Sequence, residues 1–210
     1  MTAIILTYYI QRRKYLPMII AALKNNIVPC TIIVFNQGKI PLDPIEGVTV
    51  INSEMNFGCS VRHSLALCIE DDCFFFQDDD LMVLPNTIEK MQAYLTPDNV
   101  AGVDGCILTD GSYTTAIPVR DETRGVSIVT GRVHLCKKKA LVNAFELRER
   151  LGLKIFREDD IVLSLANRDN MVVKAGIVNF DEAGIGLSHE PAHYTERDKI
   201  CRAIYETITQ

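Results

Sequence analysis

The sequence predicts an α/β fold in which a mostly parallel central sheet is flanked by helices. Three observations support this fold class. Short apolar runs rich in β-branched or aromatic residues alternate with helical patterns through residues 1–96, and the links between them are short. The chain of 210 residues is also 48% hydrophobic, which is enough to bury a substantial core. We therefore expect helices on both faces of the sheet, followed by a smaller, irregular second half.

The predicted elements of residues 1–96 follow one another in a regular order. The first run is β-branched and typical of a buried strand, and the next carries apolar positions at helical spacing. Asn36-Gln37-Gly38 supplies the turn chemistry that ends a second strand. In chain order, the predicted strands are 3–9, 30–38, 47–53 and 73–77, and the predicted helices are 15–26, 60–70 and 85–95.

The elements of residues 97–210 are less regular. A polar loop, 111–124, separates two apolar runs typical of strands, and an acidic run at 157–160 introduces a helical pattern. The predicted strands are 100–110, 125–136 and 172–180, and the predicted helices are 137–152, 161–169 and 196–208. No repeat or linker divides the chain, so we expect one domain over residues 1–210. The last helix has no stop signal, which leaves open a longer polypeptide.

Composition argues against several classes of function. The formal net charge of -5 argues against a nucleic-acid partner, because a phosphate backbone attracts a basic surface. The seven cysteines are scattered and form no C-x-x-C pair, which argues against a disulfide framework or a zinc knuckle. The apolar run 3–6 is too short for a signal peptide, and no stretch is long enough for a membrane span. We therefore expect a cytoplasmic protein.

The segment FFFQDDDLM, residues 74–82, joins the most apolar strand to three consecutive carboxylates. Adjacent carboxylates repel one another in a partly buried site, and Mg²⁺ or Mn²⁺ would remove the conflict. Alternation predicts that Asp78 and Asp80 share one side while Asp79 points away. The alternative is a solvated turn that caps the next helix. The three phenylalanines argue against that alternative, because a strand buried on both faces ends inside the protein.

Ligands of such sheets bind at the carboxyl ends of the strands, which places Thr7 to Tyr9, Asn36 and Asp78 to Asp80 along one edge. Three motifs in order then resemble the GT-A nucleotide-sugar glycosyltransferases. They are the D-x-D of Asp78 to Asp80, the opening Leu6-Thr7-Tyr8-Tyr9 with Arg12 and Arg13, and Asp159-Asp160-Ile161-Val162-Leu163-Ser164 at a helix start. The resemblance implies a Rossmann-like GT-A fold, with a nucleotide-binding half at 1–96 and an acceptor-binding and catalytic half at 97–210.

Within this family, the opening strand and the length are most similar to the N-terminal domain of the large glycosyltransferase of chlorella viruses, which would place the protein in the host cytoplasm. The resemblance implies a nucleoside-diphosphate sugar as donor, usually a UDP-sugar, and a glycan or glycoprotein hydroxyl as acceptor. Thr7, Tyr9 and Asn36 would hold the nucleoside, because a hydroxyl and an amide can hydrogen-bond a base edge and a tyrosine can stack on it. The alternative for the tyrosines is a core position, and alternation predicts that Tyr8 points inward.

The resemblance also assigns the metal. Asp78 and Asp80 would bind Mn²⁺ or Mg²⁺, which bridges the diphosphate, with Asp79 beside them. Family members often complete the coordination with a C-terminal histidine, here His189 or His193. The alternative is that these histidines are structural, as a lone histidine usually is.

Three further residues would contact the donor diphosphate. Gly58, in a stretch that resembles the family's N-x-G-x-x-x-x-R, would allow a close backbone approach. Arg62 would pair with an aspartate of the acidic cluster or with the diphosphate, and Arg197 would reach the phosphates. The alternative for both arginines is an exposed position on a helix.

Asp160 falls on the catalytic carboxylate of the family's E-D-x-x-L-S pattern. It would remove the proton from the acceptor hydroxyl, or stabilise the sugar cation if the reaction proceeds with retention. Glu158-Asp159 is itself such a pair, so Asp159 is the alternative catalytic residue. Both aspartates also suit a first helical turn, which favours acids. Gly131, Arg132 and His134 align with residues that line the sugar and acceptor pocket.

Two other classes of function compete with a glycosyltransferase. A nucleotidyltransferase or phosphohydrolase would use the same paired carboxylates, but it would want a glycine- and lysine-rich phosphate loop near the first strand, and the sequence has none. An inactive sugar-nucleotide-binding module would bind the nucleotide without turning over the donor.

Overall fold

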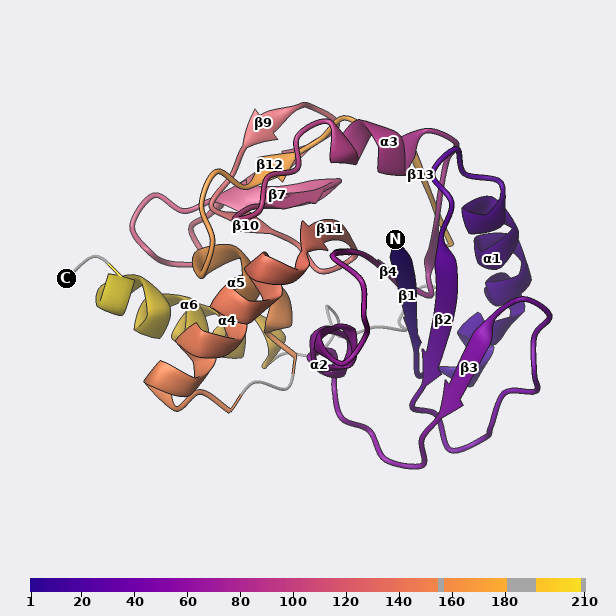
Figure 1. Cartoon of the computed structure of the whole chain (residues 1–210). Coiled ribbons are helices and arrows are strands. Elements are labelled where there is room, and N and C mark those ends of the chain that lie inside the picture. Colours follow the sequence, from indigo (N-terminus) through magenta and orange to yellow (C-terminus); the bar gives the residue numbers. More distant parts are fainter. Residues whose placement is uncertain (155–156, 181–191, 209–210) are drawn as a thin grey trace.

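The computed structural model describes residues 1–154, 157–180 and 192–208 (Figure 1). An eight-stranded sheet forms its centre, with the strand order β3-β2-β1-β4-β11-β6-β12-β9. Four strands from the N-terminal half lie parallel to one another: β1 (Thr2–Thr7), β2 (Thr31–Asn36), β3 (Thr49–Asn52) and β4 (Cys73–Asp78). The predicted mostly parallel α/β sheet is therefore confirmed.

The rest of the central sheet comes from the C-terminal half of the chain. These strands are β6 (Val100–Gly102), β9 (Arg124–Gly125), β11 (Val133–Lys137) and β12 (Met171–Val172). β11 is antiparallel to both β4 and β6, and β12 is parallel to β6. The register aligns Thr7 with Asn36 and Leu6 with Asp78, so the carboxyl ends of β1, β2 and β4 meet at one edge. The predicted common edge is confirmed.

Helices cover both faces of the sheet, and each face has its own apolar cluster (Figure 1). The pleat of β4 divides its phenylalanines between them: Phe74 and Phe76 lie in one cluster, and Phe75 lies in the other. One face carries a 3₁₀ helix (Ile10–Tyr15), α1 (Leu16–Lys24) and α3 (Thr87–Gln92). The other carries α2 (Val61–Leu67), α4 (Lys138–Leu151), α5 (Asp159–Leu165) and α6 (His193–Ile208).

Local chemistry explains several helix ends. Pro17 stands in the first turn of α1, where a missing N–H costs nothing. α4 ends at Gly152, whose positive φ of 60° lets the chain turn back so that Leu153 N donates to Arg148 O at 3.1 Å. α5 begins at Asp159, two residues before its predicted start, so both aspartates lie in its first turn. None of the described helices is long and apolar enough to cross a membrane.

The predicted long strands of the second half are wrong in extent, because each is divided between two sheets. The predicted strand 100–110 forms β6 in the central sheet and then β7 (Asp104–Ile107), which pairs with β8 (Ile117–Arg120) and β10 (Ile128–Val129). Glycine permits this crossing: a Cβ on Gly102 would lie 2.2 Å from Val129 Cγ1, and one on Gly105 would lie 2.5 Å from Ile128 O. β8 also lies inside the segment predicted as a loop.

The other two long strands divide in the same way. The predicted strand 125–136 becomes β10 and β11, separated at residues 130–132. The predicted strand 172–180 becomes β12 and β13 (Ile177–Asn179), and β13 pairs antiparallel with β5 (Leu81–Val83). β5 follows the acidic cluster directly, so the carboxylates stand in a tight connection between two strands. Leu81 and Val83 are buried, so apolar residues enclose the acidic cluster on this side as well.

Candidate active site at the carboxyl edge of the sheet

Asp78, Asp79 and Asp80, which we call the acidic edge, leave the end of β4 in alternating directions. The Asp79 side chain is 4% exposed, whereas those of Asp78 and Asp80 are 32% and 26% exposed. The predicted separation of Asp79 from Asp78 and Asp80 is therefore seen in exposure, although Arg12 contacts Asp79 and Asp80 together. A solvated turn does not describe the cluster.

Arg12 binds two members of the acidic edge at once. Its Nη1 lies 3.1 Å from Asp79 Oδ1, and its Nη2 lies 3.1 Å from Asp80 Oδ2. Burial raises the pKa of Asp79, although Thr7 and Arg12 oppose that shift. Sequence reasoning did not assign Arg12 to the site. The basic run Gln11-Arg12-Arg13-Lys14, placed directly after the first strand, was the signal for it.

Arg62 connects the acidic edge to the start of α5. Its Nη1 lies 2.9 Å from Asp78 Oδ1, and its Nε lies 2.8 Å from Asp159 Oδ2. The side chain is 2% exposed, so the alternative of a surface arginine is wrong. Burial raises the pKa of Asp78 to about 7, with Asp79 and Asp80 adding to the shift and Arg62 opposing it. The carboxylates of the acidic edge thus repel one another, and Arg62 does not fully offset this repulsion at Asp78.

Asp160 faces the opposite direction, toward α6. Arg197 binds it through two hydrogen bonds, Nη1 to Oδ1 at 3.0 Å and Nη2 to Oδ2 at 2.8 Å. The guanidinium also lies 4.3 Å from the centre of the Tyr113 ring. Burial alone would raise the pKa of Asp160, but Arg197 outweighs it and the pKa is lowered. We call Arg62, Asp159, Asp160 and Arg197 the inner network.

Two histidines lie behind the inner network. Nε2 of His63 is 3.0 Å from Nε2 of His134, and the His134 ring stacks on Phe76. His134 Nδ1 lies 3.2 Å from the carbonyl oxygen of Gly131, which only accepts, so Nδ1 carries the proton. Because burial keeps the pKa of His134 well below its usual range, its Nε2 accepts and His63 donates. His134 was predicted to line the sugar pocket, but it is only 1% exposed and its ring is already paired with His63.

The other two residues aligned with the sugar pocket also have partners. A Cβ on Gly131 would lie 2.6 Å from Arg62 Nη2 and 3.4 Å from Asp160 Cβ, so this glycine stands between the two aspartate–arginine pairs. Arg132 binds Asp104 at 3.1 Å and also contacts Asn179. Gly131 therefore joins the site, whereas Arg132 lies against β7 and β13.

The nucleoside-binding candidates end adjacent strands, but Asn36 has no hydrogen-bonding group left for a base. Its amide oxygen accepts from Arg13 Nη2 and from Gly38 N, both at 3.0 Å. Its amide nitrogen donates to Ile40 O at 3.1 Å and to Asn52 Oδ1 at 2.7 Å. An amide has two donors and two lone pairs, so Asn36 is fully used in shaping the loop after β2.

The end of β1 presents one tyrosine outward. Tyr8 is 42% exposed, so the prediction that it points inward is wrong, because the strand ends at Thr7 and its alternation stops there. Tyr9 is half-buried, and Arg12 lies 5.1 Å from the centre of its ring. Thr7 is buried at 1% exposure. Of the two tyrosines, Tyr8 is the one whose side chain is exposed to solvent.

Gly58 has a φ of 74°, a left-handed conformation that favours glycine. Gln37 holds the surrounding loop through both ends of its amide: its nitrogen donates to Gly58 O at 3.1 Å, and its oxygen accepts from Phe57 N at 2.7 Å. The loop therefore has a fixed shape beside the acidic edge. The backbone requirement for glycine is met, and the contact with a diphosphate stays a prediction.

The residues present fit a divalent cation in part. Among the described residues, three arginines face five ionisable aspartates, Asp78 to Asp80, Asp159 and Asp160, which leaves two negative charges when all five are ionised. Asp80 Oδ1 is buried and accepts no hydrogen bond from any described residue. Within the described ranges, no three acids, histidines or cysteines form a ready-made metal site. His193 begins α6, half-buried, and its ring lies 5.3 Å from that of Tyr194, whereas His189 lies outside the described residues.

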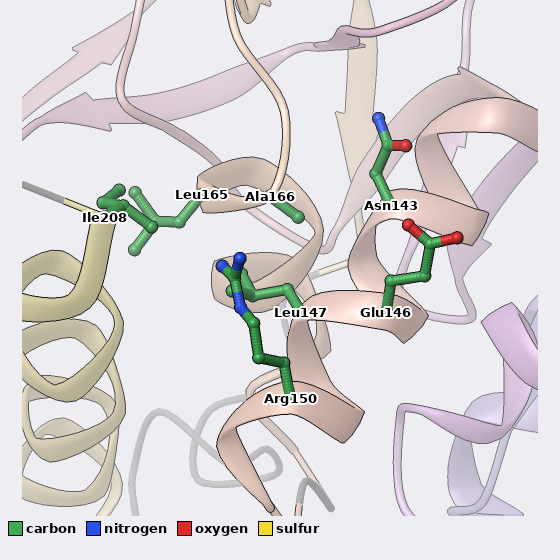
Figure 2. Close-up of a pocket in the computed structure, with 7 residues that line it drawn as sticks. All are labelled: Asn143, Glu146, Leu147, Arg150, Leu165, Ala166 and Ile208. Atoms are coloured by element: carbon green, nitrogen blue, oxygen red, sulfur yellow. The ribbon is translucent and has the colours of Figure 1, made fainter.

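A separate hollow of about 400 Å³ opens between α4, α5 and the end of α6 (Figure 2). Its lining mixes apolar side chains with Glu146 and Arg150. None of the residues that line it belongs to the acidic edge or to the inner network. This hollow is therefore distinct from the candidate active site.

No family model matches the sequence, and no curated protein matches it. Several solved structures, in contrast, resemble the structure of this chain. The structure of S. aureus TarS residues 1–349 in complex with UDP-GlcNAc has a TM-score of 0.62 at 13% identity, and the match covers 95% of this chain and 64% of that one. The structure of GalNAc-T7 with UDP, GalNAc and Mn²⁺ also has a TM-score of 0.62, at 10% identity, covering 95% of this chain and 47% of that one.

The chain thus spans less than two thirds of the length of either neighbour. Both neighbours are GT-A glycosyltransferases, and at these identities the likeness concerns the fold. The chain therefore has the mixed α/β fold of the GT-A glycosyltransferases.

Proposed function

We propose that this protein is a metal-dependent glycosyltransferase that moves a sugar from a nucleoside-diphosphate donor, a UDP-sugar, to a hydroxyl of a glycan or glycoprotein. One observation carries the proposal. The guanidinium of Arg62 joins the partly exposed Asp78 of the acidic edge to Asp159, one of a second pair of aspartates that is buried. A transferase needs these two parts together, a place for the diphosphate and a carboxylate for the acceptor.

The neighbours support the choice of donor. One was solved with UDP-GlcNAc and the other with UDP, GalNAc and Mn²⁺. In this chain, Tyr8 offers an exposed ring and the loop held by Asn36 and Gln37 offers backbone groups for the nucleoside. The Tyr9 ring packs edge-on against the Tyr8 ring with the ring centres 5.0 Å apart, and Thr7 is buried at the end of β1.

A divalent cation would be held by Asp78 and Asp80, with His193 or His189 as further ligands. When bound, Mn²⁺ or Mg²⁺ would neutralise charge on the departing nucleoside diphosphate. The chain's own residues perform the rest. Arg12 orients Asp80 and Asp79, Arg62 orients Asp78, and the enclosed aspartates of α5 hold or accept the proton of the acceptor hydroxyl.

Calorimetry with UDP tests the metal assignment. We expect UDP binding that requires Mn²⁺ and becomes at least tenfold weaker, about 1.4 kcal/mol, in Asp80→Ala. Asp72→Ala is a matched control, because Asp72 precedes β4 at the opposite end and its side chain is 72% exposed. Equal UDP affinity in wild type and Asp80→Ala would rule out the metal site.

Donor turnover tests the reaction itself. A panel of UDP- and GDP-sugars is incubated with Mn²⁺, and the free nucleotide released is measured. We expect metal-dependent release from at least one UDP-sugar. If UDP binds but no donor is turned over, the chain is a binding module and the enzymatic proposal fails.

A further inference from the structure

The acidic pair at the start of α5 offers two carboxylates for one catalytic role. Burial does not separate them, because the side chains of Asp159 and Asp160 are 2% and 5% exposed. Position in the helix does not separate them either, since both lie in the first turn. Their hydrogen bonds, taken oxygen by oxygen, do.

Asp160 has no acceptor site left. Oδ1 accepts from Arg197 Nη1 at 3.0 Å and from Ile161 N at 2.9 Å. Oδ2 accepts from Arg197 Nη2 at 2.8 Å and from Gly131 N at 2.9 Å. Each carboxylate oxygen accepts about two hydrogen bonds, so Asp160 must break one of these four to receive a proton.

Asp159 has capacity in reserve. Its Oδ2 accepts from Arg62 Nε at 2.8 Å and lies 3.7 Å from His63 Nε2. Its Oδ1 accepts no hydrogen bond from any residue in the described ranges. Arg62 also ties Asp159 to Asp78, whereas Asp160 turns toward Arg197 and Tyr113. Asp159 is therefore the member of the pair that lies on the side of the acidic edge.

Arg197 explains what Asp160 does instead. Two hydrogen bonds and the Tyr113 ring fix its guanidinium, and its Nε is buried without a hydrogen-bond partner among the described residues. A buried donor without a partner costs free energy, so it is a place where an anionic oxygen of a ligand would bind favourably. The two hydrogen bonds to Asp160 hold the Arg197 guanidinium, and with it this N–H group, in position.

We propose that Asp159 receives the proton of the acceptor hydroxyl, and that Asp160 is a positioning residue that acts through Arg197. The inference rests on the proposed glycosyltransferase function. The hydroxyl proton moves to Asp159 Oδ1 while the hydroxyl oxygen forms the new bond to the anomeric carbon. The bond from that carbon to the diphosphate oxygen breaks, and its electron pair leaves with the nucleoside diphosphate.

The test compares Asp159→Asn with the double variant Asp160→Asn/Arg197→Gln. Asp160→Asn alone would leave a buried guanidinium without its counter-charge, whereas the double variant removes one charge of each sign. Steady-state kinetics are measured with the UDP-sugar and acceptor that the wild type uses. The charged and titratable groups facing Asp159 include Arg62, His63, Asp78 and, less directly, Cys59, and these four are unchanged in both variants.

We expect Asp159→Asn to lower kcat by about 100-fold or more and to keep donor KM near the wild-type value. We expect the double variant to show mainly a raised donor KM, because the guanidinium of Arg197 is no longer there to bind an anionic oxygen of the donor. A purely structural role for Asp160 would not raise KM selectively.

Three results would overturn the inference. They are a double variant that loses kcat while Asp159→Asn keeps it, an equal loss of kcat in both variants, and an unchanged donor KM in the double variant. A wild type that releases no nucleotide from any donor overturns the proposed function together with this inference. A reversed pattern in an active enzyme overturns the inference alone.

Discussion

The aspartates of the acidic edge and those of the inner network are all paired with arginines, yet the two regions differ in their exposure to solvent. The side chains of Asp78 and Asp80 are about a third to a quarter exposed, whereas those of Arg62 and Asp159 are 2% exposed. Burying charge is costly unless the partners fit closely, so the inner network fixes geometry. The acidic edge leaves charge open, which is what a site for a ligand requires. Arg62 is the residue common to both, because it binds Asp78 and Asp159.

Replacing Arg62 is expected to have the largest effect on this comparison. Arg62→Met keeps much of the apolar side chain but leaves Asp159 buried without its counter-charge, which costs about 3–5 kcal/mol in the free energy of unfolding. Chemical denaturation measures that loss. Arg12→Met is the matched control at the acidic edge. Asp80 remains in contact with water there, and burial already raises the pKa of Asp79, so protonation can replace its lost partner and a smaller loss of about 1–3 kcal/mol is expected. Equal losses in the two variants would show that the difference in exposure has no energetic meaning.

The histidine pair gives the second effect, which depends on pH. Burial lowers the pKa of His63 to about 4, with Asp159 opposing and Arg62 adding to the shift, while His134 and Asp160 also face the ring. Unfolded histidine has its pKa near 6.5, so the unfolded state binds a proton first as pH falls. The contribution of His63 is complete above about pH 6.5 and is lost progressively down to pH 4, by about 3 kcal/mol.

This prediction is checked by comparing the pH dependence of unfolding free energy in wild type and His63→Gln. Glutamine keeps an N–H for His134 but does not titrate. Other groups contribute to both curves, so the difference between the curves isolates His63. Between pH 7 and 4, we expect the wild type to lose about 3 kcal/mol more unfolding free energy than His63→Gln. Parallel curves would mean that the His63 ring is not desolvated in the folded protein.

The sequence predicted the first half of the fold well because its elements are set by local patterns. Phe74 to Phe76 reveal a strand buried on both faces, and one short link after another implies parallel strands. The second half depends on contacts between distant residues. Nothing near Gly102 shows that β6 must end so that Val129 can pass above it, and the division of three predicted strands follows from such crossings.

The candidate site divides in the same way. The motif positions Asp78, Asp80, Asp159 and Asp160 could be chosen by residue type and order, and the structure brings them together. Their pairing could not be predicted, because the partners of Arg62 lie 16 and 97 residues away in sequence. Asn36 shows the opposite limit. Its residue type suits a nucleobase, but only the coordinates reveal that its amide is fully used within its own loop.

The smallest predicted effect concerns Gly131, where the two aspartate–arginine pairs approach each other. A methyl group there would lie 2.6 Å from Arg62 Nη2 and in ordinary contact with Asp160, so Arg62 must move. Its guanidinium is held by Asp78 and Asp159 and has little freedom. We expect Gly131→Ala to cost about 1–2 kcal/mol in unfolding free energy. Gly125→Ala is the matched control, because its nearest heavy atom would be 4.0 Å away, and a change within about 0.5 kcal/mol is expected.

Gly131→Ala also separates the two regions functionally, because moving Arg62 disturbs its bond to Asp78 without altering any carboxylate. If Arg62 sets the orientation of Asp78, then Mn²⁺-dependent UDP binding should weaken in Gly131→Ala and stay unchanged in Gly125→Ala, measured by calorimetry. A stability loss with unchanged UDP binding would mean that the acidic edge keeps its geometry independently of the inner network. The bridge through Arg62 would then matter for folding and not for the donor.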